Sequence, residues 1–182
     1  MIIKNRNDMI LPNLYEFFSK KDNIDEMLPI IMGESKISIR LLDWFVTNYS
    51  KDKKLYYKID NITFNVHVDY KSQLKGYKKK LFDPFCREKR IPFYYNDKEY
   101  VITTIGQLNF FKWAISKKIL TYVNNNYNVI YKDMQKKKEL IDSEELTSND
   151  SKLLLLKTSD DNIVLQKTIF FNEKIEINFD VI

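Results

Sequence analysis

The sequence has few of the residues from which most enzyme sites are built. Its 182 residues include one cysteine, one histidine and only three glycines, which are far apart. One cysteine cannot form an internal disulfide, and one cysteine with one histidine cannot supply the four ligands of a structural zinc site. The separated glycines form no GxGxxG or GxxxxGK loop for phosphate. We therefore expect no metal, no cofactor and no enzymatic activity.

Long apolar runs are also missing. No stretch approaches the ~18 residues of a membrane-spanning helix, and the start, MIIKNRNDMI, lacks the pattern of a secretory signal. We expect a chain without membrane insertion that is not secreted and is made in a reducing compartment.

Positive charge is abundant and unevenly placed. The chain has 30 Lys and Arg against 25 Asp and Glu, which gives a net charge of +5. Much of the excess lies between Lys71 and Lys118, where aromatic residues alternate with cations. Such a belt can pair cations with phosphates while rings stack on bases. The candidate nucleic-acid or partner-binding residues are Lys71, Lys75, Lys78, Lys79, Lys80, Arg87, Lys89, Arg90, Tyr94 and Tyr95, and the rings of Tyr70, Tyr77 and Phe93 could join them.

A simpler interpretation of the same belt stays open. The lysines can form a solvated helix face, while the aromatic residues belong to the core.

The first half of the chain predicts helices followed by a hairpin. Helical spacing of apolar residues favours helices at 13–18, 23–33 and 38–49, with Gly33 ending the second and Ser38 preceding the third. Alternation then predicts strands at 54–60 and 61–70, joined at Asp60 and Asn61. A basic helix over 70–82, with Tyr70, Leu74, Tyr77 and Leu81 as its apolar stripe, is expected to follow.

The second half predicts a second hairpin and the longest helix. Strands at 90–95 and 99–104 precede a helix over 105–125, which Thr103 or Thr104 can cap and whose apolar residues cover more than one face. Strands are expected in LLLLKT (153–158), NIVLQKTIFF (162–171) and KIEINFDVI (174–182). The predicted fold is α+β, with small antiparallel hairpins packed on a long central helix. We divide it into a core at 1–140, a charged linker at 141–152 and strands at 153–182, which are either separate or part of the same domain.

The run FDPFCREKRIPFYY (82–95) is predicted to be a folded corner. Asp83 and Pro84 would end the basic helix, and Phe82 and Phe85 would fix the turn in the core. A cysteine nucleophile is the alternative, because the cations around Cys86 lower a thiol pKa. It would need His67 as its base, with Asp69 or Asp83 as the third group. A lone cysteine beside phenylalanine is more typical of a small buried apolar residue, so we assign no catalytic residue.

Three long strings carry a resemblance: SIRLLDWFVTNYSK (38–51), FNVHVDYKSQLKGYKKKLFDPFCREKRIPFYY (64–95) and TTIGQLNFFKWAISKKILTYV (103–123). Together they resemble a family of small proteins encoded by nucleocytoplasmic large DNA viruses, including giant-virus and iridovirus-like lineages. The likeness covers nearly the whole chain from about Asn13. It implies a viral origin and a setting in the cytoplasmic viral factory or the virion, and it supplies no catalytic or binding residues.

Two functions are consistent with these observations. The first is a non-enzymatic minor capsid, virion structural or assembly component that contacts other viral proteins. The second is a basic factor that binds DNA or RNA during packaging or transcription of the viral genome.

Overall fold

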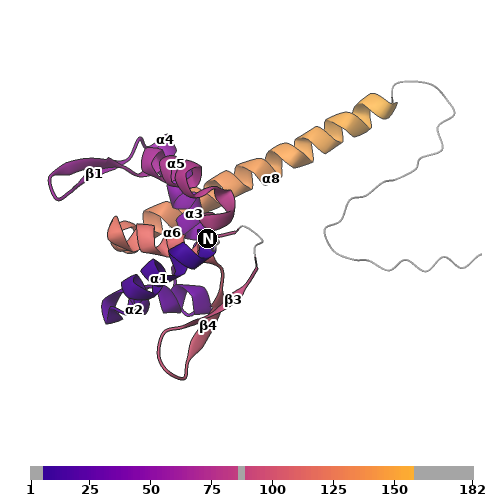
Figure 1. Ribbon diagram of the computed structural model, residues 1–182. Helices are drawn as coiled ribbons and strands as arrows, with labels where there is room; N and C mark the ends of the chain where they lie inside the picture. Colours follow the sequence, from indigo (N-terminus) through magenta and orange to yellow (C-terminus); the bar gives the residue numbers. More distant parts are fainter. Residues whose placement is uncertain (1–5, 86–88, 158–182) are drawn as a thin grey trace, which may run out of the picture. The chain divides into compact units, whose positions relative to one another are not determined.

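The computed structural model describes residues 6–85 and 89–157, with side chains at 9–85 and 89–143 (Figure 1). The chain divides into two units, Met1–Glu139 and Leu140–Ile182, and each is considered by itself. The described residues form helices and two small antiparallel sheets of two strands each, which confirms the predicted α+β class.

The N-terminal helices are those that the spacing predicts, with different ends. Gly33, at φ 78°, ends the second helix, and the Ser38 side chain accepts a hydrogen bond from the Leu41 amide at the start of the third, as expected. The first helix begins well before Pro12, and the third continues through a π-helical stretch. The elements are α1 (Arg6–Phe18), α2 (Lys21–Met32), α3 (Ile39–Trp44), a π-helix (Phe45–Tyr49) and α4 (Ser50–Asp52).

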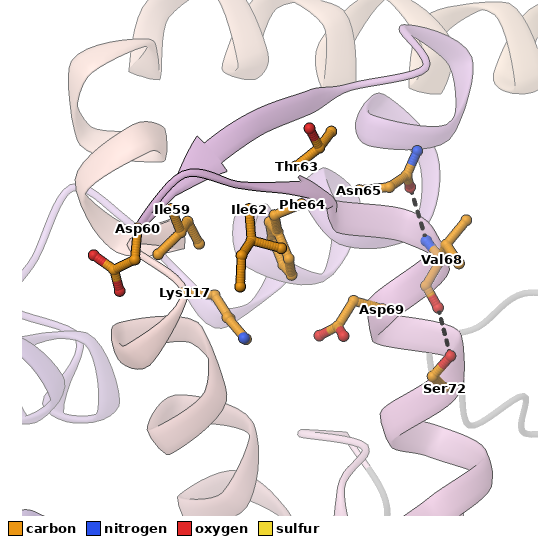
Figure 2. Close-up of a pocket in the computed structure, with 10 residues that line it drawn as sticks. All are labelled: Ile59, Asp60, Ile62, Thr63, Phe64, Asn65, Val68, Asp69, Ser72 and Lys117. Atoms are coloured by element: carbon orange, nitrogen blue, oxygen red, sulfur yellow. Dashed lines mark hydrogen bonds between the residues drawn. The ribbon is translucent and has the colours of Figure 1, made fainter.

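The first hairpin is shorter than predicted. Strands β1 (Tyr56–Ile59) and β2 (Ile62–Asn65) are joined at Asp60 and Asn61, both with positive φ, as the sequence indicates. The predicted continuation of the second strand to residue 70 is wrong. Asn65 instead caps helix α5 (Val66–Tyr77), because its side-chain oxygen accepts from the Val68 amide at 3.0 Å (Figure 2).

The sequence misled here because the apolar residues at 62, 64, 66, 68 and 70 alternate. Val66 and Tyr70 are buried at helical spacing, whereas Val68, which a strand would bury with them, is exposed. The capping asparagine was the signal that the alternation concealed.

The basic helix ends earlier than predicted, and the corner after it is built differently. Lys78 takes φ 68°, and a single 3₁₀ turn, η2 (Lys79–Leu81), leads into the corner. Phe82 is fully buried, as predicted, but Phe85 is 52% exposed, so it does not fix the turn. The Asp83 carboxylate accepts from the Phe85 amide at 2.8 Å, a local bond typical of a turn that an aspartate begins.

The second hairpin is confirmed, and the long central helix is not. Strands β3 (Ile91–Tyr94) and β4 (Tyr100–Thr103) pair as expected, and Thr104 caps α6 (Ile105–Ser116) by accepting from the Gln107 amide. The helix then breaks, because Lys118 takes φ 55° before α7 (Ile119–Asn125) begins. The Tyr57 hydroxyl, from a distant strand, donates to the Lys117 carbonyl at 2.6 Å and stabilises this break. No glycine or proline lies at the break to predict it from the sequence.

Helix α8 (Tyr127–Lys157) extends through the stretch predicted as a charged linker and through 153–157, where a strand was predicted. Lys, Glu, Gln and Leu are strong helix formers, so a lack of apolar residues does not end the helix. The predictions for 158–182 lie outside the described residues, and the proposed domain division stays a prediction.

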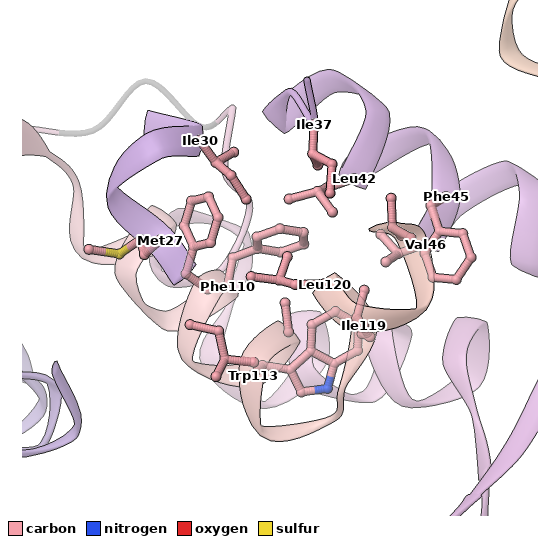
Figure 3. Close-up of a cluster of buried hydrophobic side chains, with 14 of the residues drawn as sticks. Met27, Ile30, Ile37, Leu42, Phe45, Val46, Phe110, Trp113, Ile119 and Leu120 are labelled. Atoms are coloured by element: carbon pink, nitrogen blue, oxygen red, sulfur yellow. The ribbon is translucent and has the colours of Figure 1, made fainter. Parts of the chain in front are cut away.

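Helix α6 is the centre of the core in the first unit. It packs against α1, α2, α7 and η2, and most of its side chains are buried. Figure 3 shows Phe110 and Trp113 of α6 beside residues of α2, α3, the π-helix and α7. Helix α6 is thus covered on several sides, which agrees with the prediction that it is buried on more than one face.

The close approach of α6 to the corner allows a stability test. A Cβ added at Gly106 would lie 3.1 Å from the carbonyl oxygens of both Lys80 and Asp83, which are backbone atoms. We expect Gly106→Ala to lower the free energy of unfolding by about 1–3 kcal/mol, as overpacking does. Urea denaturation of the purified protein measures it.

Gly76 provides the matched control, because a Cβ there would meet no described atom within 4 Å. Gly76→Ala should leave stability unchanged or raise it by up to ~1 kcal/mol through helix propensity. Equal stability changes in the two variants would show that α6 does not depend on contact with the corner.

Candidate interaction surfaces

The outer face of the second hairpin exposes a cluster of apolar and aromatic side chains. Pro92 pairs with Ile102 and Tyr94 with Tyr100, so the four project from the same face of the sheet. Pro92 is exposed, and Tyr94, Tyr100 and Ile102 are 50%, 51% and 48% exposed. The two tyrosine rings lie 5.2 Å apart between centroids. We call these four residues the hairpin face.

The opposite side of this hairpin is fixed to the core. Phe93 is buried and lies between Tyr15 and Phe18 of α1, with ring centroids 4.6 and 5.7 Å away. Thr103 is buried too, and its hydroxyl donates to the Gln107 side chain at 2.8 Å. The hairpin face therefore stands on a rigid support.

Cations flank the hairpin face at the start of β3. Lys89 and Arg90 are exposed, and within 6–85 and 89–157 neither forms a salt bridge. At the other end, the Asn96 side chain accepts from the Lys98 and Glu99 amides and donates to the Glu99 carboxylate. The turn thus holds its own acidic group, while the cations near β3 lack a carboxylate partner among the described residues.

The remaining predicted cations lie on α5 and the turn after it. Lys71 and Lys75 are exposed one helical turn apart, Lys78 is exposed at the helix end, and Lys79 lies 3.5 Å from the Asp83 carboxylate. Lys80 is exposed as well, and Arg87 lies outside the described residues. In Figure 1, α5 and the β3–β4 hairpin lie apart in the first unit, so the candidates fall into two groups.

Most of the rings proposed for base stacking belong to the core. Tyr70 and Phe93 are buried, and Tyr77 is half-buried with its ring stacked 5.7 Å from Phe82. Tyr95 is half-buried against the core, so Tyr94 alone of the predicted rings is exposed. The sequence analysis missed Tyr100 and Ile102, although pairing of 90–95 with 99–104 places them opposite Tyr94 and Pro92.

The residues of the alternative cysteine site serve the fold. The His67 Nδ1 lies 3.1 Å from the Val46 carbonyl oxygen, to which it must donate, and Asp69 accepts from the indole N–H of Trp113. Cys86 itself lies outside the described residues.

Asp43, on α3, is the carboxyl group that lies near Asp83 and Lys79. Burial, and then the Asp83 carboxylate, raise the pKa of Asp43, while Lys79 lowers it. In the described part of the chain, no three His, Cys, Asp or Glu residues are grouped to hold a metal ion.

Among the described helices, none has the length and apolar character needed to cross a membrane.

Comparison with known proteins gives a family. Residues 2–177 match the family of unknown function DUF7197. The chain is 46% identical over 159 residues to the uncharacterised protein L507 of Acanthamoeba polyphaga mimivirus, a match that covers 79% of this chain and 61% of that relative. The chain thus spans less than two thirds of the relative's length. No solved structure matches.

The hairpin face can be separated experimentally from the core beneath it. A Tyr94→Ala, Tyr100→Ala double variant should change the free energy of unfolding by less than about 1 kcal/mol, because surface substitutions usually cost little and the rings are half exposed. Phe93→Ala, next to Tyr94 in the same strand but on the buried face, should cost about 3–5 kcal/mol. Thermal unfolding followed by circular dichroism compares them, and a large loss in the double variant would assign the tyrosines to the core.

Proposed function

The chain belongs to the DUF7197 family and has a giant-virus relative, and we propose that it is a non-enzymatic assembly component that binds another viral protein through the hairpin face. Its place would be a minor capsid or other structural position in the virion or the viral factory. The exposed pair of tyrosines with Pro92 and Ile102 on a rigid hairpin is the observation that carries this proposal.

The composition of the hairpin face supports a protein partner. Exposed apolar clusters rimmed by polar residues are typical of protein interfaces, and tyrosine and arginine are enriched among the residues that dominate binding energy. Ordered backing by Phe93 reduces the conformational entropy lost on binding. The partner surface should be apolar at its centre, to cover the tyrosines.

Charge complementarity defines the rim of the partner. Lys89 and Arg90 are exposed beside the hairpin face. A partner with carboxylates at the edge of its apolar patch would pair with both, and such charges mainly improve the rate and specificity of association.

A second candidate, nucleic-acid binding, is favoured by α5. Within the described residues, Lys71, Lys75 and Lys78 have no salt-bridge partner, and the first two share one helix face. Lysines in this arrangement can neutralise phosphates without reading sequence. Tyr94, the exposed ring among those predicted to stack on bases, is on a different element, so it would contribute little to binding at α5.

The protein-binding proposal is tested by tagged protein purified from cells infected with the virus that encodes it. Wild type, a hairpin variant (Tyr94→Ala, Tyr100→Ala, Ile102→Ala) and an α5 variant (Lys71→Glu, Lys75→Glu, Lys78→Glu) are compared by quantitative mass spectrometry after nuclease treatment. We expect a viral partner that is at least about tenfold depleted in the hairpin variant, since hot-spot losses exceed 1.4 kcal/mol.

The same partner should be retained by the α5 variant and by wild type after nuclease. Loss of every viral partner on nuclease treatment, or equal recovery with the hairpin variant, would contradict the proposal. The identified partner is then produced alone, and its affinity for wild type and both variants is measured.

The nucleic-acid candidate predicts a different response. In fluorescence-anisotropy titrations with a duplex DNA and an RNA, affinity should fall steeply with salt. The α5 variant should reduce the slope of log K against log salt by about 0.9 for each phosphate that its lysines no longer neutralise. Binding that is absent at low salt, or identical in the α5 variant, would exclude this role for α5.

A further inference from the structure

A cavity beneath the first hairpin has no role in the proposed function. Its volume is about 420 Å³, and it lies between β2, the start of α5 and the end of α6 (Figure 2). Ile59, Ile62 and Phe64 extend into it from the hairpin, and Val68 lies on the α5 side. Ile62 and Val68 are 72% and 61% exposed, so the cavity has an apolar wall that is open to solvent.

Asp69 and Lys117 face this space, and Asp60 lies at its edge on the hairpin turn. Figure 2 shows Asp69 and Lys117 pointing toward the same space, with Asp60 at the end of the hairpin. Lys117 Nζ lies over the Phe64 ring, 5.5 Å from its centroid, and forms no salt bridge with either aspartate in the described part of the chain. The acidic side chains therefore outnumber the cation.

Asp69 is held in position from behind. One of its carboxylate oxygens accepts the indole N–H of Trp113, whose side chain is buried in the core. Among the described residues, no side chain donates a hydrogen bond to the other carboxylate oxygen. Because the indole bond fixes the carboxylate at the cavity wall, a ligand would not have to order it.

We propose that this cavity binds a basic side chain, arginine or lysine, presented by an extended segment of a partner protein. The aliphatic stem would lie on Ile62, Phe64 and Val68, and the charged head would reach Asp69, while Asp60 on the hairpin turn would add negative charge at the edge of the cavity. Such side chains bury an apolar stem and keep a charged tip, which fits a cavity with an apolar wall and carboxylates at its edge.

The position of Lys117 supports the same chemistry. The Lys117 ammonium lies over the Phe64 ring, 5.5 Å from its centroid, so the cavity wall already accommodates one basic side chain of this protein. Lys117 would then oppose the ligand through like charge, so its removal should strengthen binding. An anionic ligand would show the opposite dependence on Asp69 and Lys117.

The test uses the full ¹⁵N-labelled chain and the peptide acetyl-Leu-Arg-Leu-amide, with the citrulline and aspartate analogues as matched neutral and acidic probes. Amide shifts of Ile62, Phe64, Val68 and Ser72 report binding at the cavity. We expect saturable binding of the arginine peptide, about tenfold weaker binding of the citrulline analogue and no binding of the aspartate analogue, since a charged hydrogen bond is removed or reversed.

Three variants test whether the cavity prefers a positively or a negatively charged ligand. Asp69→Asn keeps an oxygen for the Trp113 indole and should weaken arginine-peptide binding about tenfold, Asp60→Asn should weaken it less, and Lys117→Met should strengthen it. Equal affinity for the arginine and citrulline peptides, tighter binding of the aspartate peptide, or no shifts at millimolar peptide would overturn the proposal. Should Asp69→Asn alter the fold, the probe series and the Lys117→Met comparison still decide.

The hairpin variant (Tyr94→Ala, Tyr100→Ala, Ile102→Ala) should bind the arginine peptide as wild type does. This control separates the cavity from the hairpin face, so either proposal can fail without the other.

Discussion

The contact between α6 and the corner that precedes the second hairpin is the constraint on which the first unit depends. The buried Asn109 side chain donates to the Leu81 carbonyl at 2.8 Å, and Gln107 donates to the Pro84 carbonyl at 3.1 Å. Gly106 allows the two backbones to approach. An irregular corner leaves carbonyls without helix or sheet partners, and polar side chains on a largely apolar helix supply them. The corner in turn orients Phe82 into the core.

Capture of backbone carbonyls by side chains also explains two irregular helices. In the π-helix, the Val46 carbonyl accepts from the Ser50 hydroxyl at 3.0 Å and lies 3.1 Å from His67 Nδ1. At the end of α6, the Tyr57 hydroxyl donates to the Lys117 carbonyl, and burial raises the pKa of this tyrosine, which keeps the donor protonated. The contacts of His67 and Tyr57 each join a helix to an element elsewhere in the sequence, so the irregular positions are places of tertiary contact.

This pattern defines how much of the fold the sequence could predict. Local signals were sufficient for Gly33, the Ser38 and Thr104 caps, the Asp60–Asn61 turn and the pairing of β3 with β4. They failed where a distant partner decides, as at Lys118, or where one pattern fits two periods, as in 62–70. Proline was a weak guide, since Pro12 and Pro29 both lie inside helices.

The surfaces were less predictable than the fold, because charge in a sequence does not specify direction. A belt of cations near aromatic residues suggested one site, yet Tyr70 and Phe93 are buried and the cations divide between α5 and the β3–β4 hairpin. Only the cross-strand register shows that Tyr100 and Ile102 share a face with Tyr94 and Pro92.

The two tryptophans of the chain give the molecule separate internal probes. Trp113 donates its indole N–H to Asp69 at the cavity wall, whereas Trp44 donates to Asp133 at 3.3 Å in the first part of α8. Lys137 also lies over the Trp44 ring, 5.5 Å from its centroid. Because indole emission responds to hydrogen bonding and nearby charge, the intrinsic fluorescence of this protein contains two signals of different origin. The Trp113 signal reports on the cavity, and the Trp44 signal reports on the contact between α3 and the first part of α8. Replacing either tryptophan by phenylalanine allows the emission of the other to be measured alone.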